Sequence, residues 1–543
     1  MDNKKYKTAY IIAVLLLLII SLYTLSRSQQ NAEYQQDINK YIADRWDMLY
    51  SSGYPTEQLI VDTKLSDKEP LRVFITRNEV MERVKKNIFT RMKNPAIINI
   101  TVFPMDPLSY SFENHENGMV YLPYPYVVSG GRFNELHGWD SYFIVLGLIR
   151  HNRYIMAENI ANNLVYEINN YGKVLSSNRS YNLQCSNQPF FSRMSLEIYY
   201  RTENKKWLEA VLEATEKYYK YWTQPPHLTP QTGLSRYYGM TDTPCQEALY
   251  CPLYDKGRNY YDMIIEAYYN LKKSKTETNL PYNINDYYIH NKNIKKAQLK
   301  KEFFIADRAV RESGFYSTGR FGLFGAGITD YNPVCLNSLL YVMEKDLAEM
   351  NLILGNDSES RQWINAYLKR KELINRYMWD NDTGLYYDYN FTQKQRSNYR
   401  FVTSFYPMWA GIPDKTQAKR LVDNLAVFER AGGVSCSDKS STQNQWDDPA
   451  GWAPMQVITA QALEEYGFKK DAERIALKWC STILGEYKKY NNIYEKYDIN
   501  KCSREMELNP IYRYTEYGPA WTGASFVVLL DIISDQNKTA NLK

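Results

Sequence analysis

Three tracts of the sequence place carboxylates and guanidinium groups beside large aromatic rings. Ser129–Tyr142 reads SGGRFNELHGWDSY, Gln445–Pro454 reads QWDDPAGWAP, and Tyr494–Asp498 reads YEKYD. A pyranose ring presents hydroxyl groups that donate and accept hydrogen bonds around an apolar face, so its site needs polar forks beside aromatic plates. These residue types are consistent with a carbohydrate site. For any single residue, the alternative is a salt bridge that braces a loop or a buried aromatic ring.

The elements that must hold these tracts are mainly helical. From Asp140 onward, apolar residues recur with helical spacing, while strand-like alternation is scarce. The segments with helical spacing are Tyr154–Asn170, Trp207–Trp222, Tyr260–Lys273, Asn337–Leu354, Trp363–Trp379, Lys415–Phe428, Met455–Tyr466 and Asp471–Tyr487. The unusual residue combinations gather in the connectors between helices, where binding residues commonly lie. Periodicity alone does not choose between a toroid and a solenoid.

The first two tracts each resemble one of the two signature patterns of the trehalases. These are glycoside hydrolases that split the α,α-1,1 linkage of trehalose into two glucoses. Further matches follow in the family's order: GKVLSSNRSY (Gly172–Tyr181), NQPFF (Asn187–Phe191), GLSRYY (Gly233–Tyr238), PVCLNSLLY (Pro333–Tyr341), YEKYD (Tyr494–Asp498) and GPAWTG (Gly518–Gly523). The resemblance implies a mainly α fold, a six-fold (α/α)6 toroid or six-hairpin barrel, with the cleft where the glycine- and aromatic-rich loops gather.

The same resemblance implies which side chains act. Those that contact the glucose units would be Arg132, Trp139, Asp140, Asn178, Arg179, Gln188, Arg236, Glu247, Trp446 and Asp447. Glycoside hydrolysis usually takes a protonated acid for the leaving oxygen and an ionised base for the water. In inverting enzymes, which the trehalases are, the two carboxyl groups stand about 6.5–9.5 Å apart. The resemblance assigns the base to Glu495, whose alternative is an exposed carboxylate paired with Lys496.

The general acid is where this sequence departs from the family pattern. The family has Glu-Ser-Gly-aromatic-Asp here, whereas Glu312–Arg320 reads ESGFYSTGR, so Tyr316 occupies the place of the aspartate. The ordinary pKa of a phenol is near 10, against about 4 for Asp, which makes Tyr the poorer proton donor. Losing general-acid help typically costs about 10²–10⁴ in rate. Three substitutes are conceivable: Glu312, Asp330, or Tyr316 with a pKa lowered by Arg320. The family carries the first two beside its own aspartate.

A second departure concerns the second glucose. Where the family has Arg-Pro-Glu after the GLSRYY tract, this chain reads TPCQEAL, with Cys245 at the arginine position and Glu247 retained. Ser129 and His137 also replace residues that are usually Pro and Tyr in the first signature. Loss of a guanidinium fork should weaken recognition of the second sugar. Both departures indicate a sugar pocket that persists while the trehalose-cleaving machinery has drifted.

Three functions remain open on this basis. The leading hypothesis is a trehalase-like hydrolase that converts α,α-trehalose to two glucoses with inversion, through Glu495 and the Tyr316 region. The second is a catalytically silent protein that binds or senses a sugar. The third is a hydrolase of another α-glucoside, since the subsite for the second sugar is altered. In each case the partner is a small-molecule sugar, most simply trehalose.

Composition narrows the remaining classes. The chain has 543 residues, 44% of them apolar, which is ample for a large core. Its 50 Tyr and 11 Trp mostly serve such a core, although rings that line a cleft also stack on sugars. The net charge of +5, with interleaved signs, lacks the basic stripe of a nucleic-acid binder. Seven scattered cysteines imply no disulfide framework, although one or two pairs are possible. No motif predicts a metal site or a cofactor.

The amino terminus carries an apolar run, Ala9–Leu25, with Lys4, Lys5 and Lys7 before it and Arg27 after it. This pattern predicts an uncleaved membrane anchor with an exported body, periplasmic in a bacterium, and a cleaved signal peptide is the alternative. The resulting division is a cytoplasmic tail over 1–8, an anchor over 9–26, a stalk and amino-terminal wrap over 27–95, and a trehalase-like domain over 96–543.

Overall fold

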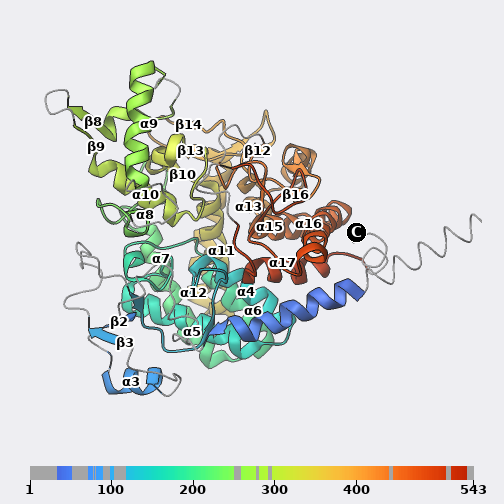
Figure 1. Cartoon of the computed structure of the whole chain (residues 1–543). Coiled ribbons are helices and arrows are strands. Elements are labelled where there is room, and N and C mark those ends of the chain that lie inside the picture. Colours follow the sequence, from blue (N-terminus) through green and yellow to red (C-terminus); the bar gives the residue numbers. More distant parts are fainter. Residues whose placement is uncertain are drawn as a thin grey trace, which may run out of the picture.

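The computed structural model describes residues 33–51, 71–76, 79, 81–89, 98–102, 118–249, 259–276, 280–291, 296–438, 444–508 and 515–534. Helices dominate the described chain (Figure 1). The body contains α4 (Gly138–Arg150), α5 (Tyr154–Tyr171), α6 (Phe191–Thr202), α7 (Lys205–Thr223), α8 (Gln246–Leu249), α9 (Tyr260–Ser274), α10 (Lys301–Glu312), α11 (Val334–Leu354), α12 (Asp357–Met378), α13 (Tyr406–Ala410), α14 (Lys415–Asp423), α15 (Ala453–Glu465), α16 (Lys469–Tyr490) and α17 (Ala520–Leu530). The prediction of a mainly helical body is confirmed.

Strands in the body are short. They are β6 (Leu228–Thr229), β7 (Leu234–Ser235), β8 (Tyr288–Asn291), β9 (Lys296–Leu299), β10 (Tyr331–Asn332), β11 (Trp379–Asp380), β12 (Leu385–Tyr386), β13 (Tyr389–Asn390), β14 (Gln395–Arg396), β15 (Glu429–Arg430), β16 (Gly433–Val434), β17 (Ala450–Trp452) and β18 (Lys496–Asp498). Most form hairpins with the next strand along the chain, whereas β10 pairs with β13, and β17 with β18, across intervening helices. One of these pairs, β17 with β18, joins two of the tracts singled out above.

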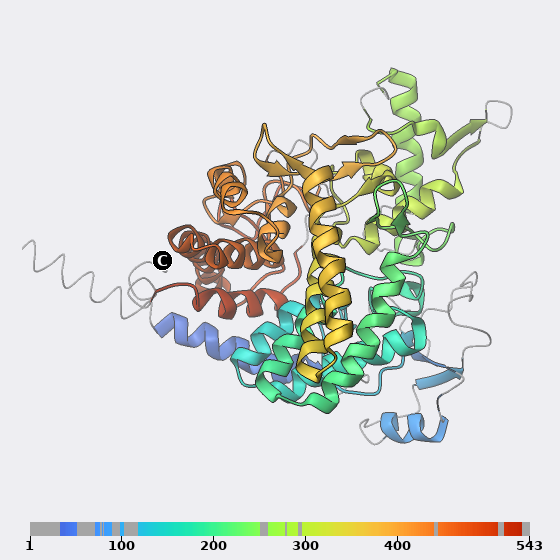
Figure 2. The same ribbon diagram turned by 180° about the vertical axis from the view of Figure 1, so that it is seen from behind.

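Six helices form a closed ring at the centre of the body. Each packs against the next in the order α4, α6, α11, α13, α15 and α17, and α17 returns to α4. Longer helices cover the outside: α5 packs on α4 and α6, α12 on α11, and α16 on α15 and α17. Figure 2 shows the α11–α12 pair standing side by side. This arrangement is the helical barrel that the sequence predicts.

The sequences of the ring and cover helices explain their places. Helix α17 reads AWTGASFVVLL and buries every residue from Ala520 to Leu529, and α4 is buried almost all round. A helix that is apolar on all sides belongs inside a core, whereas an amphipathic one belongs at its surface. Helix α12 is of the second kind, since only four of its residues, Ile374 and Met378 among them, are buried and its sequence is rich in charged side chains. Gly147 lets α4 approach α17 closely, because a Cβ there would lie 2.8 Å from the Ala524 Cβ.

The amino-terminal region packs onto the body. Residues 33–49 form a helix that buries Ile38, Ile42 and Trp46. After it, β1 (Tyr50–Ser51) pairs with β5 (Tyr126–Val127), and a parallel sheet joins β2 (Leu71–Ile75) to β3 (Ile98–Val102) and β4 (Met119–Val120), next to α3 (Met81–Phe89).

The predicted membrane anchor over 9–26 lies outside the described residues. Within the ranges given above, no helix combines the length and the apolar character needed to cross a bilayer. Six of the cysteines lie in these ranges, and each is a free thiol: Cys185, Cys245, Cys335, Cys436, Cys480 and Cys502.

Candidate active site

A column of stacked tryptophans marks the place where the sequence tracts meet. Trp139, in the first turn of α4, stacks on Trp446 with ring centroids 5.3 Å apart. Trp446 in turn stacks on Trp452 of β17 at 4.1 Å and 9°. Trp521 of α17 meets both ends of the column edge-on. All four rings are buried, and the indole Nε1 of Trp139 donates to no described protein atom. The GWD and QWDDP tracts are therefore joined by ring contacts.

Glu495 lies at the Trp452 end of this column. Strand β18 begins at Lys496, which is paired in register with Trp452. The Lys496 Nζ lies 3.0 Å from Glu495 Oε2 and 5.1 Å from the centre of the Trp452 ring. Lys496 is buried, whereas the Glu495 side chain keeps 16% of its surface exposed. Glu495 is thus neither a free surface carboxylate nor sealed from solvent, which suits a group that must meet a substrate and a water molecule.

Glu516 connects Glu495 to the first tract. Its carboxylate accepts from the Arg132 side chain, with Nε 3.0 Å from Oε1, and from the Arg132 backbone N–H at 3.3 Å. Its backbone carbonyl accepts from the Glu495 N–H at 2.9 Å. Sequence reasoning missed Glu516. The available signal was its position two residues before the GPAWTG match that starts at Gly518.

Asp140 shares this region. Burial raises the pKa of its carboxyl, His137 and a hydrogen bond with Ser129 lower it, and the nearby charge of Glu495 raises it again. Two carboxylates that influence each other's protonation lie in one electrostatic environment. The contacts of Glu516 with Arg132 and with the Glu495 backbone bring the first signature and the EKYD tract together, and Ser129 and His137 act on Asp140 in the first of them.

Gln188 and the ESG tract close the inner side of the Trp139 ring. The Gln188 amide donates to the Ser313 carbonyl at 2.9 Å and accepts from the Tyr406 hydroxyl at 3.0 Å. Gly314 has φ +77°, and a Cβ there would lie 2.4 Å from the Trp139 ring and 3.3 Å from the Gln188 Nε2. Only glycine fits, so the segment that leads to Tyr316 packs directly against the tryptophan column.

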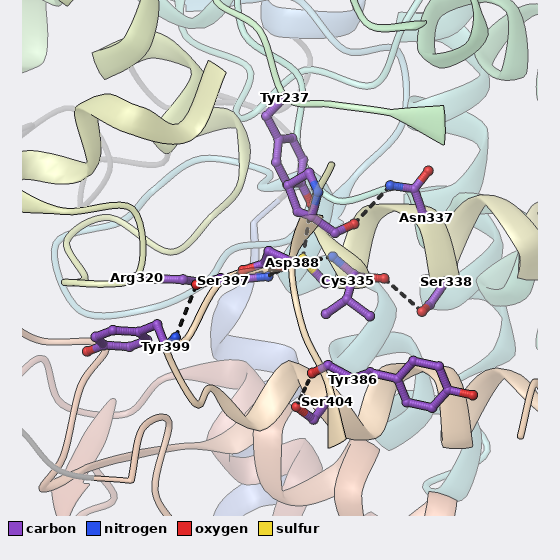
Figure 3. A network of polar contacts seen from close by, with 12 residues as sticks. Tyr237, Arg320, Cys335, Asn337, Ser338, Tyr386, Asp388, Ser397, Tyr399 and Ser404 are labelled. Atoms are coloured by element: carbon purple, nitrogen blue, oxygen red, sulfur yellow. Dashed lines mark hydrogen bonds and ion pairs between the residues drawn. The ribbon is translucent and has the colours of Figure 1, made fainter. Parts of the chain in front are cut away.

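Tyr316 has a guanidinium over its ring, but it belongs to Arg311 rather than to Arg320. The Arg311 guanidinium carbon lies 4.2 Å from the ring centre, and Tyr260 meets the ring edge-on. Arg320 is instead held in a buried ion pair with Asp388, with Nε 2.6 Å from Oδ2 (Figure 3). Arg320 is thus engaged with Asp388, and Arg311 is the guanidinium that faces the Tyr316 ring.

Glu312 is fully engaged and is not available as a replacement acid. Its carboxylate accepts from the Tyr221 hydroxyl at 2.5 Å and from the Tyr238 N–H at 3.1 Å, and it contacts the His227 Nε2 at 3.2 Å. Burial raises the pKa of Glu312, but the charge of His227 and these hydrogen bonds outweigh burial, so the pKa lies below its ordinary value. A carboxyl that stays ionised cannot deliver a proton near neutral pH.

This environment makes Glu312 a pH-dependent source of stability. Because its pKa is lower in the folded chain than in the unfolded chain, Glu312 stabilises the fold above about pH 4.5. That contribution is lost as the pH falls through the folded-state pKa. We expect Glu312→Gln to lower the free energy of unfolding at pH 7 by about 1–3 kcal/mol, and to lower it less at pH 4. Urea unfolding at both pH values measures this, and equal losses at the two pH values would contradict it.

Asp447 proves to be a brace for the loop that contains Tyr316. Its carboxylate accepts from the Thr318 hydroxyl at 2.9 Å, the Gly319 N–H at 2.9 Å and the Tyr399 hydroxyl at 2.8 Å. The neighbouring Trp446 N–H donates to the Ser317 carbonyl at 3.1 Å. Asp447 therefore fixes the Tyr316 loop against the tryptophan column, which is the loop-bracing alternative considered for it.

Removing this charge should loosen the loop. Asp447→Asn replaces a carboxylate that accepts from several donors by an amide with one acceptor, so we expect unfolding to become easier by about 1–3 kcal/mol. The near-ultraviolet circular dichroism of the tryptophans should weaken as well, because Trp446 is the residue next to Asp447. Asp448→Asn is the matched control. Asp448 is the next residue, but it is less buried than Asp447 and forms its ion pair with Arg430. Equal effects of the two substitutions would contradict the role assigned to Asp447.

Two further candidates serve the scaffold. The Asn178 amide accepts from the Leu136 N–H at 2.8 Å and donates to the Val120 carbonyl and the Tyr126 hydroxyl. Arg179 forms a buried ion pair with Glu135 at 2.6 Å. The side chain of Asn178 thus joins separate loops of the scaffold, and the side chain of Arg179 is used in a buried ion pair.

The remaining candidates are Arg236, Asp330 and Glu247. Arg236 donates to the carbonyls of Pro226 and Thr329, and its guanidinium covers Tyr238. Asp330 follows Thr329 directly, and burial raises the pKa of its carboxyl. Asp330 therefore remains a conceivable proton donor. The side chain of Glu247, in α8, lies outside the described part of the chain.

Cys245 is completely buried next to guanidinium groups from α10. Its N–H donates to the Tyr261 hydroxyl at 2.6 Å, and Arg308 donates to the carbonyl of the preceding Pro244 at 2.9 Å. The thiol thus fills space beside Arg308, and no guanidinium extends from position 245 itself.

Curated proteins of known activity are similar to much of this chain. The cytosolic neutral trehalase of Saccharomyces cerevisiae is 33% identical over 476 residues, which are 80% of this chain and 60% of that protein. The cytosolic neutral trehalase of Kluyveromyces lactis is 35% identical over 420 residues, which are 72% of this chain and 53% of that protein. The chain therefore spans little more than half the length of these relatives.

These relatives contradict the predicted export of the body, since their names describe cytosolic proteins. The prediction depended on the apolar run within 9–26, which lies outside the described residues. That run is near the lower length limit for spanning a bilayer, and flanking lysines alone do not distinguish an anchor from other apolar segments. The predicted membrane partnership has no support from the described helices.

A solved structure and a family model are also similar to this chain. The neutral trehalase Nth1 from Saccharomyces cerevisiae superposes with a TM-score of 0.74 at 28% identity, over 93% of this chain and 94% of that one. The family model described as Trehalase matches residues 105–534, which contain the ring of helices, the tryptophan column, Glu495 and Glu516. Because the family model matches most of the chain and the yeast relative is 33% identical over 80% of it, this chain is a member of the trehalase family.

Proposed function

We propose that this protein is a trehalase-type glycoside hydrolase that acts on α,α-trehalose with inversion, slowly for lack of a carboxylic acid at position 316. The body over 96–543 is its catalytic domain. The observation that supports this proposal best is a series of contacts around Glu495. The stacked tryptophans reach it through Lys496, and Arg132 reaches it through Glu516. These contacts join aromatic plates to charged groups, as a glucose site requires.

In the proposed mechanism, Glu495 is the general base. Its carboxylate accepts a proton from a water molecule that attacks the anomeric carbon, and the glycosidic bond to the second glucose breaks. The buried ammonium of Lys496 favours the ionised carboxylate and fixes one of its oxygens, because an adjacent opposite charge stabilises the charged form. Arg132, Asp140 and the tryptophans hold the ring of the first glucose.

The leaving oxygen must also receive a proton. In the proposed arrangement Tyr316 provides a hydrogen-bond donor, and the Arg311 guanidinium above its ring favours the phenolate that proton donation would leave. Asp330 is the second source considered, because burial raises its pKa. Either route is weaker than an Asp directly beside the bond, so a low turnover number is expected.

The experiment that tests this proposal measures binding and turnover separately. We expect calorimetry to detect trehalose binding to the purified protein, and a glucose assay to detect slow release above that of Glu495→Gln. Release no higher than that of the variant would contradict the proposal.

A second candidate is a sugar-binding protein without turnover. Tyr316 and the full engagement of Glu312 favour it, because neither group supplies a ready proton. Trehalose or glucose binding with no glucose release would support this candidate. Hydrolysis of another α-glucoside, which the buried Cys245 suggests, would instead appear as release from aryl or oligosaccharide glucosides but not from trehalose.

A further inference from the structure

The helix over 33–49 lies before the residues matched by the trehalase family model, 105–534. It nevertheless packs against the ring, since Ile42 contacts the position of Gly523 in α17 and Trp46 contacts that of Gly147 in α4. In Figure 1 it is the blue helix that runs alongside α17 and α4. These contacts bring its polar side chains to the loops of the active site.

Arg45 of this helix reaches Gly518, where the loops of the site meet. Its Nη2 lies 3.3 Å from the Gly518 carbonyl. The Gly518 N–H donates to the Ile493 carbonyl at 2.7 Å, two residues before Glu495. On the other side, a Cβ on Gly130 would lie 2.7 Å from the Gly518 oxygen, so the loop that carries Arg132 rests on the same point.

The Arg45 guanidinium packs directly against the Gly518 backbone. It has φ +66°, and a Cβ at this position would lie 1.8 Å from the Arg45 Nη2. The left-handed backbone and the close approach together exclude a larger residue. The Arg45 guanidinium therefore occupies the space that a side chain at 518 would fill.

A second contact holds the same loop from the other end. The Tyr41 hydroxyl, one helical turn before Arg45, donates to the Asn492 Oδ1 at 2.6 Å. The Arg45 guanidinium lies 5.7 Å from the Tyr41 ring centre, and its Nε is buried without a described acceptor. A buried donor without a partner has an energetic cost. An apolar side chain of similar length would fill the same space without the cost of burying Nε.

We infer that Arg45 and Tyr41 are positioning residues for the active site, which fix the loops that carry Glu495, Glu516 and Arg132. The inference rests on the proposed role of Glu495 for its catalytic part. Arg45 anchors Gly518, Tyr41 anchors Asn492, and the Glu495 backbone between them is fixed by its bond to the Glu516 carbonyl. The orientation of the base thus depends on a helix outside the family-matched region.

The test compares Arg45→Met and Tyr41→Phe with the control Asp47→Asn. Met keeps most of the Arg stem, and Phe keeps the ring. Asp47 lies on the same helix as Arg45 and forms an exposed ion pair with Arg153, the residue before α5. Hydrogen exchange of the substrate-free protein is the first measurement. We expect the amides of Glu495 and Gly518 to exchange at least 10-fold faster in Arg45→Met, with core amides of α4 unchanged. Unchanged exchange at Glu495 and Gly518 would overturn the inference.

Glucose release from trehalose is the second measurement, made in the natural and Tyr316→Asp backgrounds. Arg45→Met should misplace the base and lower kcat about 10-fold, since small displacements can reduce rates by up to about 10²-fold. KM should change little, because the residues proposed to hold the sugar remain. Asp47→Asn should leave kcat unchanged. If exchange rises but no background releases glucose, the hydrolase proposal fails while the positioning of the loop stands. If release is present and kcat is unaffected, the catalytic part of the inference is wrong.

Discussion

Tyr316→Asp should raise the rate of glucose release from trehalose by about 10²–10⁴-fold, the range that general-acid catalysis typically contributes. The carboxyl would stand in the loop that Asp447 and Gly314 already hold against the tryptophan column. A protonated Asp, with an ordinary pKa near 4, transfers a proton to a leaving alkoxide far more readily than a phenol does. The gain should therefore be largest at acidic pH, where the carboxyl keeps its proton. The measurement is the initial rate of glucose formation by the variant and the natural protein.

Two further variants make this prediction specific. Tyr316→Phe removes the hydroxyl without adding an acid, so it should show no gain. Arg311, whose guanidinium lies over the ring, would keep a new carboxylate ionised and shift its optimum to lower pH. Adding Arg311→Ala to Tyr316→Asp should therefore move the optimum upward. A Tyr316→Asp rate no higher than that of Tyr316→Phe would contradict the assignment of position 316 to the acid.

Glu495→Gln should reduce glucose release by about 10²–10⁴-fold, since it removes the proposed base while keeping the shape of the side chain. Gln cannot accept a proton from water, and it loses the ionic contact with Lys496. Binding of glucose should change little, because Trp139, Trp446 and Arg132 remain in place. Rates and calorimetric affinities of the same preparations separate the two effects.

The matched control for this variant is Glu505→Gln. Glu505 is exposed and lies ten residues further along the chain, so its neutralisation should leave the rate unchanged. A Glu495→Gln protein that retains its rate would exclude Glu495 as the base.

The fold was predictable to the extent that its helices are amphipathic. The segment expected over Tyr154–Asn170 corresponds to α5, and Lys415–Phe428 contains α14 but ends in a short 3-10 turn. Helices α4 and α17, which form part of the ring, escaped detection because residues buried on all sides have no polar face and so no period to read. Ring closure depends on contacts between distant segments, which a local pattern does not contain.

Within the site, the residue types predicted that the signature tracts would lie close together. They predicted the role of each single residue less well. Trp139 and Trp446 meet as expected, and Glu495 lies beside them with Lys496 as its partner. Asp447, by contrast, has the residue type of a sugar ligand but accepts from its own scaffold, and only the partners of its oxygens reveal this. Arg320 is a similar case, because its partner Asp388 lies 68 residues further along the chain and a local pattern does not reveal the ion pair.

The most direct test of the central claim combines the two substitutions at the reacting groups. Glucose release from trehalose should be measured for Tyr316→Asp and for the double variant Tyr316→Asp/Glu495→Gln. We expect rapid release by the single variant and a return to the background rate in the double variant, because acid and base would act on one bond. Equal release by both proteins would contradict this claim.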